Sequence, residues 1–285
     1  MKIQPLAFDS MGVRSMATCI ETDQKIMIDP GAALGPMRYS LPPHPVELSK
    51  LNELSELVEG CTKISGILII SHYHYDHYFP CGTDIYKNKI LLIKDPKHSI
   101  NYSQKDRAKN FLEEIKNLPH RIEFADSREF KFNETEIKFS PAVRHGAVNS
   151  KLGFVIMTSI SYKNERLIHA SDIQGPETDE TTGWIINENP DVLILSGYPT
   201  LFIGWRLSQQ GLEKSNENLI KILEETKVKT VVLDHHLVRD LYYKTKILGV
   251  LETAKKQGKN VVTAAEFLGR ENEFLEARRK ELYKQ

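Results

Sequence analysis

Residues 66–77 have the sequence GILIISHYHYDH, in which an apolar run leads directly into a polar one. The run 66–70 has the length and composition of a β-strand that is buried on both faces. The next seven positions hold four side chains of the kinds that bind metal ions: His72, His74, Asp76 and His77. Packing alone does not account for them, because buried imidazoles and carboxylates need polar partners. The stretch therefore predicts a metal site at the end of a core strand.

The spacing of these four residues indicates two metal ions. His72 and His74 are separated by one residue, and in an extended segment such side chains point to the same side, so both can reach one ion. Asp76 and His77 are adjacent. If the chain turns into a helix there, both can reach a second ion beside the first. A structural site of the zinc-finger type does not need two ions.

The pattern His72-x-His74-x-Asp76-His77 matches the HxHxDH motif, and the chain resembles the metallo-β-lactamase superfamily in this respect. The resemblance covers almost the whole chain, because single residues further along match the remaining positions of the family in order. It implies an α/β fold, a four-layer αββα sandwich that residues 1–285 form as one domain. Within the superfamily, a mainly archaeal branch looks most similar, and the doublet in Asp234-His235-His236 is its most suggestive feature.

The resemblance also implies which residues hold the metal ions. A first ion would be held by His72, His74 and His145. A second ion would be held by Asp76, His77, Asp172, which bridges both ions, and one histidine of the doublet, for which we favour His235 because it comes first after the strand. Asp29 would support the site by hydrogen bonding. We expect two divalent ions, with zinc favoured and iron or manganese open.

The same ligand set implies a catalytic mechanism. Two ions lower the pKa of a bridging water, polarise the scissile group and stabilise the developing oxyanion. The sequence has no GxSxG elbow and no P-loop, so no protein nucleophile is expected. Asp76 would orient the attacking hydroxide as well as bind metal. His236 is the first candidate for the proton donor to the leaving group, with Tyr198 and His169 as alternatives.

Apolar periodicity predicts alternating strands and helices along the chain. A loop with five prolines, 30–45, separates the first strands from the first helix, and Gly60 is expected to end that helix. The charged stretch 270–284 is interpreted as a solvated helix face. The predicted strands are 4–8, 16–21, 25–29, 66–70, 90–93, 152–159, 166–170, 191–196, 228–233 and 260–263, with a hairpin over 128–140, and the predicted helices include 46–59, 103–118, 179–187 and 208–226.

The amino-acid composition limits the classes of protein to which the chain can belong. Lys plus Arg equals Asp plus Glu, at 38 each, so the chain lacks the basic excess of most nucleic-acid-binding proteins. Cys19, Cys61 and Cys81 are widely spaced and odd in number, so we expect buried free thiols rather than a disulfide framework. Together with the absence of a signal-like or membrane-spanning apolar run, this predicts a cytoplasmic protein that does not enter a membrane.

Three functions remain open. The first is hydrolysis of a small ester, thioester, lactone or phosphoester. The second is a phosphodiesterase or nuclease acting on RNA or DNA. In the superfamily that the chain resembles, the β-CASP nucleases carry a large inserted domain between the two motifs that Asp172 and His235 match. Asp172 and His235 lie too close in sequence for such a domain. The third is a metal-binding protein without catalysis. We favour the first, with a small-molecule substrate; Arg14, Arg38, Tyr39, Arg144, Tyr198 and Arg206 are candidates to hold an anionic group.

Overall fold

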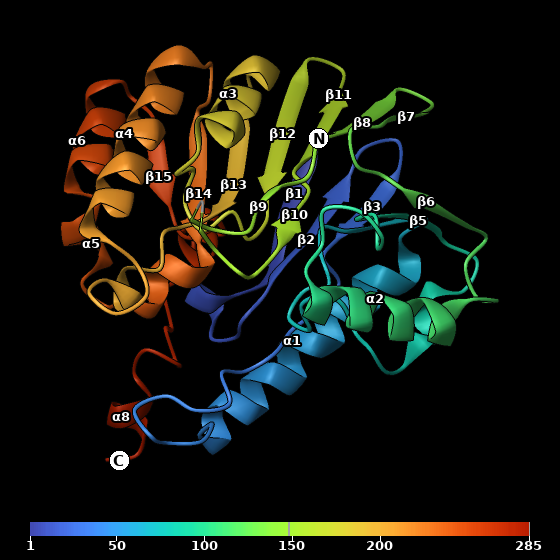
Figure 1. Cartoon of the computed structure of the whole chain (residues 1–285), viewed down its shortest axis with the longest axis horizontal. Helices are drawn as coiled ribbons and strands as arrows, with labels where there is room; N and C mark the ends of the chain where they lie inside the picture. The colour runs from blue at the N-terminus through green and yellow to red at the C-terminus, as the bar shows by residue number, and fades with distance from the viewer. Residues whose placement is uncertain (148, 285) are drawn as a thin grey trace.

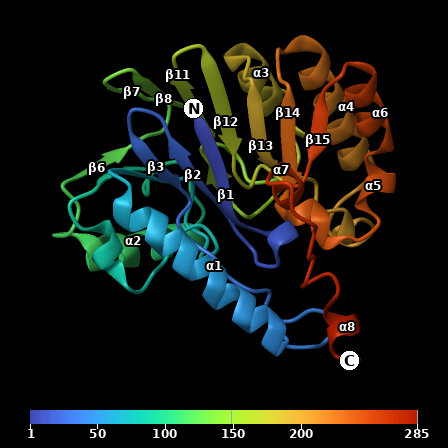
Figure 2. The same ribbon diagram turned by 180° about the vertical axis from the view of Figure 1, so that it is seen from behind.

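Two large β-sheets form the centre of the molecule (Figures 1 and 2). The computed structural model describes residues 1–147 and 149–284. The N-terminal sheet follows the order of the sequence: β1 (Lys2–Phe8), β2 (Met16–Glu21), β3 (Lys25–Ile28), β4 (Ile67–Ile70), β5 (Ile90–Ile93) and β6 (Arg121–Phe124). The C-terminal sheet has the order β15-β14-β13-β12-β11-β8-β7, with β7 (Glu129–Phe132), β8 (Thr135–Phe139), β11 (Thr158–Tyr162), β12 (Glu165–Ala170), β13 (Val192–Ser196), β14 (Thr230–Asp234) and β15 (Asn260–Val262). A short pair, β9 (Val143–Arg144) and β10 (Phe154–Val155), stands apart from both sheets.

Each sheet has an antiparallel part and a parallel part. In the N-terminal sheet β1, β2 and β3 are antiparallel, and β3 to β6 are parallel. In the C-terminal sheet β7, β8, β11 and β12 are antiparallel, and β12 to β15 are parallel. Parallel neighbours need crossover connections, which here carry most of the helices. The carboxyl ends of the parallel strands in each sheet therefore meet at one edge.

Helices cover the outer faces of the two sheets (Figure 1). On the N-terminal side these are α1 (Pro45–Ile64) and α2 (Tyr102–Ile115), and on the C-terminal side α3 (Asp179–Glu188), α4 (Gln209–Glu225) and α6 (Leu248–Lys256). This layering confirms the predicted αββα sandwich. The shorter helices are α5 (Tyr243–Lys246), α7 (Ala264–Phe267) and α8 (Arg279–Leu282), and the 3-10 turns are η1 (Asp9–Met11), η2 (Thr83–Tyr86), η3 (Thr200–Phe202) and η4 (His235–Arg239).

The apolar runs of the central strands are explained by burial on both faces. On β12, Leu167 belongs to the core between the sheets and Ile168 to the core under the outer helices. On β13 the same alternation places Ile194 between the sheets and Leu193 under the helices. Parallel strands covered on both sides read as continuous hydrophobic sequence for this reason.

Most predicted elements are confirmed, and the differences have local causes. Strand β6 was not predicted, because Arg121–Phe124 is short, polar and at the sheet edge. Helix α1 continues through Gly60 to Ile64, so the predicted stop there is wrong. The α1 start is fixed by a capping box in which His44 and Glu47 satisfy each other's backbone N–H groups.

The expectation of buried free thiols is wrong. Cys19 on β2 and Cys61 on α1 form a disulfide, and Cys81 is free and exposed. Packing of α1 on the sheet brings their Cα atoms to 6.6 Å although the two residues are 42 positions apart, and nothing in the spacing signals this. The disulfide removes the cysteine-based support for a cytoplasmic location.

The stretch 270–284 is not a solvated helix face. Only Arg279–Leu282 forms a helix there, and Arg279 is completely buried. Its guanidinium binds the buried carboxylate of Glu47 at 2.7 and 2.8 Å and the carbonyl of Gly35 at 2.9 Å. In Figures 1 and 2, α8 accordingly lies beside the loop that leads into α1. Arg279 thus holds the proline-containing loop against the start of α1.

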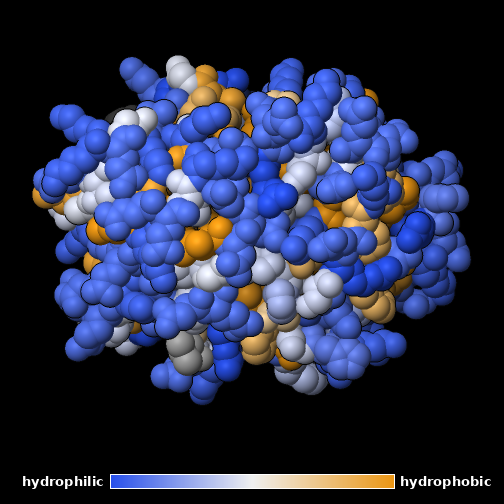
Figure 3. All heavy atoms as spheres, turned by 90° about the horizontal axis from the view of Figure 1, so that it is seen from above, coloured by the Kyte–Doolittle hydropathy of each residue, from blue (hydrophilic) through white to orange (hydrophobic). Residues whose placement is uncertain are grey.

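The face of the molecule in Figure 3 is predominantly polar. Hydrophilic side chains cover most of the face in Figure 3, with only scattered hydrophobic ones between them. Among the described residues, no helix combines the length and the apolar character that crossing a bilayer requires.

Candidate metal centre

The sequence-predicted ligands come from the carboxyl ends of strands in both sheets. Asp29 follows β3, His72 follows β4, Asp172 follows β12 and His235 follows β14. Asp29, Asp172 and His235 adopt left-handed backbone angles, with φ of 49°, 49° and 59°. Such angles are unfavourable for these residues and persist only where surrounding structure imposes them. All three residues thus lie just beyond the end of a strand, where the extended backbone has stopped.

Asp29 organises the N-terminal part of the site, as the resemblance implied. Its carboxylate accepts hydrogen bonds from the backbone N–H and hydroxyl of Ser71, both at 2.8 Å, and its Oδ2 lies 3.0 Å from Nδ1 of His77. The Ser71 hydroxyl is also 3.0 Å from Nδ1 of His72. Both imidazoles therefore present Nε2 to the centre of the cluster.

Gly31 explains how the loop after β3 comes so close. A Cβ added to Gly31 would lie 2.2 Å from the backbone nitrogen of Tyr78 and 2.6 Å from the carbonyl carbon of His77. No side chain can be accommodated at that distance. The glycine thus lets the segment after Asp29 pass directly against the backbone of the ligand segment.

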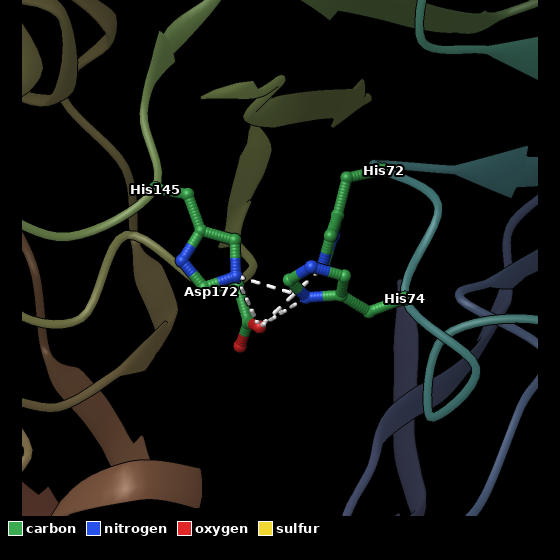
Figure 4. Close-up of side chains that lie close together, drawn as sticks. All are labelled: His72, His74, His145 and Asp172. Atoms are coloured by element: carbon green, nitrogen blue, oxygen red, sulfur yellow. Dashed lines mark hydrogen bonds and ion pairs between the residues drawn. The ribbon is translucent and has the colours of Figure 1, made fainter. Parts of the chain in front are cut away.

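Asp172 contacts histidines of both potential ligand groups, and its two carboxylate oxygens face different sets of them. Its Oδ2 faces Nε2 of His145 at 2.9 Å, Nε2 of His72 at 3.3 Å and Nδ1 of His74 at 3.9 Å (Figure 4). The same oxygen is 3.4 Å from Nε2 of His77. Its Oδ1 faces the C-terminal doublet. One carboxylate therefore touches both halves of the cluster, which is the position of a bridging ligand.

The doublet at the end of β14 divides its two histidines between different neighbours. His235 is completely buried, and its Nε2 lies 3.0 Å from Oδ1 of Asp172 and 3.7 Å from Oδ2 of Asp76. His236 is partly accessible, and its Nδ1 lies 3.6 Å from Asp172 Oδ1 and 2.9 Å from the Ser196 hydroxyl. His235 thus joins Asp76 and His77 in one potential ligand group, whereas His236 forms a group only with Asp172 and His235 among the described residues.

Unpaired buried atoms show that this cluster suits metal ions. Nε2 of His72, Nε2 of His77 and Oδ1 of Asp172 are buried and form no hydrogen bond within residues 1–147 and 149–284. Burying such atoms without partners is costly. The ligand atoms of His72, His74, His145 and Asp172 lie within 4.8 Å of one another, and so do those of Asp76, His77 and His235. Imidazole and carboxylate donors at this spacing fit two divalent ions.

The pKa values of the histidines in the metal-free cluster also indicate that the site suits cations. Burial opposes a charge on His77, but the carboxylates of Asp172 and Asp76 outweigh it and raise the pKa of His77 well above its usual value. Burial likewise opposes a charge on His235, and Asp172 with Asp9 raises its pKa to about 9. Burial and the neighbouring His77 lower the pKa of His72 well below its usual range. The carboxylates of the cluster thus favour positive charge on His77 and His235.

The alternative proton donors face away from the cluster. The Tyr198 hydroxyl donates to the carbonyl of Ser208 at 3.0 Å. His169 lies on β12 as expected, with its Nε2 3.0 Å from the carbonyl of Met16. Of the three candidate proton donors, only His236 is both next to Asp172 and partly accessible.

The candidate anion-binding residues are largely engaged elsewhere. Arg14 forms a two-point ion pair with Glu276, and Arg38 donates to the carbonyl of Arg239 at 3.1 Å. Arg144 stacks on Phe154, and Arg206 stacks on Trp205. These contacts are structural, and none of them places a guanidinium against the histidine cluster.

Sequence reasoning missed several residues that contact the doublet, among them Asp9 and Gln174. Asp9, in η1 directly after β1, lies 2.6 Å from Nδ1 of His235. Gln174, two positions after Asp172, lies 3.2 Å from Nε2 of His236. The only signal for Asp9 is its place after a strand, which many polar residues share. Sequence distance hid the contact, since 226 positions separate Asp9 from His235.

Solved structures with the same architecture establish the class of fold. The metallo-β-lactamase fold protein YhfI from Bacillus subtilis is 13% identical, with a TM-score of 0.51 over 92% of this chain and 95% of that one. A metal-dependent hydrolase of the β-lactamase superfamily is 16% identical, with a TM-score of 0.52 over 92% and 94%. CmlA, a diiron β-hydroxylase from Streptomyces venezuelae, is 9% identical, with a TM-score of 0.53 over 91% of this chain and 52% of that one. The protein has the metallo-β-lactamase fold, and this fold hosts more than one chemistry.

Sequence relatives define the family more narrowly. No family model matches the chain. A UPF0282 protein of Saccharolobus solfataricus is 46% identical over 290 residues, which cover 100% of this chain and 94% of the relative. A UPF0282 protein of Methanocaldococcus jannaschii is 45% identical over 294 residues, covering 99% and 96%. The chain belongs to the UPF0282 family, and the similarity to an archaeal branch is confirmed.

Proposed function

We propose that the protein is a hydrolase that works with two divalent metal ions, zinc in the first instance. The observation that carries the proposal is Asp172, whose Oδ2 faces the histidines of the first group and also His77, and whose Oδ1 faces His235. His72, His74 and His145 would hold the first ion, and Asp76, His77 and His235 the second, with Asp172 shared between them. Two such ions lower the pKa of a water molecule, polarise the scissile bond and stabilise the negative charge that develops.

The remaining polar residues would act around that centre. Asp76 is partly accessible, and its carboxylate would accept a hydrogen bond from the attacking water and orient it. His236 would donate a proton to the leaving group. Burial lowers the pKa of His236 well below its usual range, helped by the positive charge of His235, so the ring is neutral near pH 7 and would have to take up the proton of the attacking water before donating it to the leaving group. The Ser196 hydroxyl and the Gln174 amide hold its ring.

We further propose a small ester, thioester, lactone or phosphoester as the substrate. The net charge of zero gives no general attraction to nucleic acid. The chain between Asp172 and His235 consists of α3, β13, η3, α4 and β14, which are all parts of the sandwich. This leaves no inserted domain there to close over a polynucleotide.

Elemental analysis of the purified protein tests the metal centre. We expect about two zinc ions per native chain and loss of metal in His72→Ala and Asp172→Ala. His98→Ala is the matched control, because His98 is exposed and pairs only with Asp95. A screen of thioesters, lactones and phosphodiesters with the loaded protein then tests catalysis.

Two results would contradict the proposal. One is a folded native protein that holds no stoichiometric metal after gentle purification and reconstitution. The other is a fully loaded protein that hydrolyses a polynucleotide faster than every small ester in the screen, which would identify a nuclease.

A further inference from the structure

We propose that Asp9 is a positioning residue that holds His235 in the tautomer able to bind the second metal ion, and that Arg239 keeps Asp9 in this role. The inference rests on the proposed two-metal centre and concerns residues outside its ligand set. It assigns a role to three buried side chains that come from the two ends of the chain.

The geometry around Asp9 is closed on every side. Asp9 Oδ2 lies 2.6 Å from Nδ1 of His235, and Arg239 Nε donates to Asp9 Oδ1 at 2.7 Å. A second Arg239 nitrogen lies 3.3 Å from Oδ2. All three side chains are buried, with exposed fractions of 6% for Asp9, 0% for His235 and 7% for Arg239. The carboxylate therefore has both oxygens occupied and no freedom to turn.

This arrangement decides which nitrogen of His235 carries the proton. An ionised carboxylate only accepts hydrogen bonds, so Nδ1 must be the protonated nitrogen. Nε2 then keeps its lone pair and points at Asp172 and Asp76. A carboxylate behind a metal-binding histidine fixes its orientation and increases its basicity. Asp9 would do for His235 what Asp29 does for His77.

Hydrogen bonds next to these residues hold Asp9 and His235 in place relative to each other. The Ser10 N–H donates to Asp234 Oδ1 at 3.1 Å, directly beside the contact between Asp9 and His235. Asp234 Oδ2 accepts from the Ala264 N–H at 2.8 Å, and the Ser10 hydroxyl accepts from the Ala265 N–H at 3.0 Å. The segment after β1 is thereby joined to the segment after β14 by several bonds. A chance contact between two side chains would not be supported in this way.

The sharpest test is Asp9→Asn. The charged guanidinium of Arg239 would attract the one oxygen of the new amide, so the NH2 group would face Nδ1 of His235. Nδ1 would then have to accept, and the proton would move to Nε2. Long-range proton–nitrogen NMR of the metal-free protein, at a pH where His235 is neutral, reads the tautomer directly. We expect Nδ1–H in the native protein and Nε2–H in the variant.

Zinc titration against a competing chelator measures the consequence for binding. We expect the weaker of the two zinc affinities to fall by about 10- to 100-fold in Asp9→Asn, as found for residues behind metal ligands. The other affinity should change little. Glu47→Gln is the matched control, because it also removes a buried carboxylate from an arginine but lies at α1, away from the ligands. Its two zinc affinities should match those of the native protein.

The double variant Asp9→Asn with Arg239→Met separates positioning from folding. Without Arg239 the Asn amide can turn its oxygen toward Nδ1, so the Nδ1–H tautomer and most of the zinc affinity should return. An Asp9→Asn protein that is folded and keeps both the native tautomer and both affinities overturns the inference. If the double variant is folded but keeps Nε2–H, the role of Arg239 is overturned. A native protein with Nδ1–H but fewer than two zinc ions would instead contradict the proposed function.

Discussion

The two halves of the candidate metal centre are built in different ways. The N-terminal sheet contributes four of the proposed ligands from the single segment 71–77, between β4 and η2. The rest of the chain contributes one residue at a time: His145 follows β9, which lies outside both large sheets, and Asp172 and His235 follow β12 and β14 of the C-terminal sheet. The first half is local in sequence, and the second exists only because three chain segments end at the same edge.

The comparison separates the orientation of single histidines from the assembly of the whole ligand cluster. In the N-terminal half, Asp29 and Ser71 orient neighbouring histidines through short hydrogen bonds, so most of the geometry is set within one sheet. In the C-terminal half, Asp172 has to reach across to both groups, and its position depends on the packing of the two sheets. We therefore expect the C-terminal half to be the one on which simultaneous binding of two ions depends.

Asp172→Asn should have the largest effect on this comparison. The amide keeps the shape but loses the charge that both histidine groups face, so we expect loss of both ions. Hydrolysis should fall by about three orders of magnitude or more, because in the proposed mechanism the metal pair would supply the main catalytic effect. Metal analysis and kinetics of the reconstituted variant measure this. Retention of one tightly bound ion would mean that the segment 71–77 and His145 suffice without the bridge.

The next largest effect should distinguish the two histidines of the doublet. His235→Ala should lower the metal content to about one ion per chain, because His235 belongs to the group of Asp76 and His77. His236→Ala should keep both ions and lower kcat by about 100-fold or more, as for loss of a general acid. Elemental analysis beside steady-state kinetics compares the two variants. The reverse pattern would exchange their roles.

Metal binding should depend on pH in a way set by His77 and His235. Both have raised pKa values in the metal-free cluster, that of His235 reaching about 9. A ligand must lose its proton before it binds, so zinc binding near pH 7 should release about two protons per chain. Affinity should rise with pH and level off above about 9. Calorimetry in buffers of different ionisation enthalpy measures the release, and a count of zero would contradict the protonation described above.

The smallest expected effect concerns the outer part of the N-terminal half. Cys19→Ser should lower the free energy of unfolding by about 2–4 kcal/mol, because the disulfide to Cys61 restricts the unfolded chain. The metal content should stay at the native value, since neither cysteine contacts a ligand. Denaturant unfolding of the native and variant proteins measures the difference. A drop in bound zinc would show that α1 packing controls the ligand segment.

The sequence predicted much of the fold, because burial leaves a direct trace in composition. Strands such as Ile67–Ile70 and Val192–Ser196 are apolar on both faces, and their positions were predicted within one residue. Strand Arg121–Phe124 was not predicted, because a strand at the edge of a sheet does not need to be apolar on both faces. The buried ion pair of Arg279 and Glu47 was not predicted either, because charged residues in a terminal segment are usually exposed to solvent.

The sequence by itself determined the kind of site and the residues of its local half. Three histidines and an aspartate within six positions, directly after a core strand, are enough to predict metal ligands. Only the tertiary structure decided that Cys19 meets Cys61, that His235 rather than His236 joins the group of Asp76 and His77, and that Asp9 lies behind His235. Each of these contacts joins distant segments. Distances across a sheet or between sheets depend on topology and packing, and neither leaves a periodic signal along the chain.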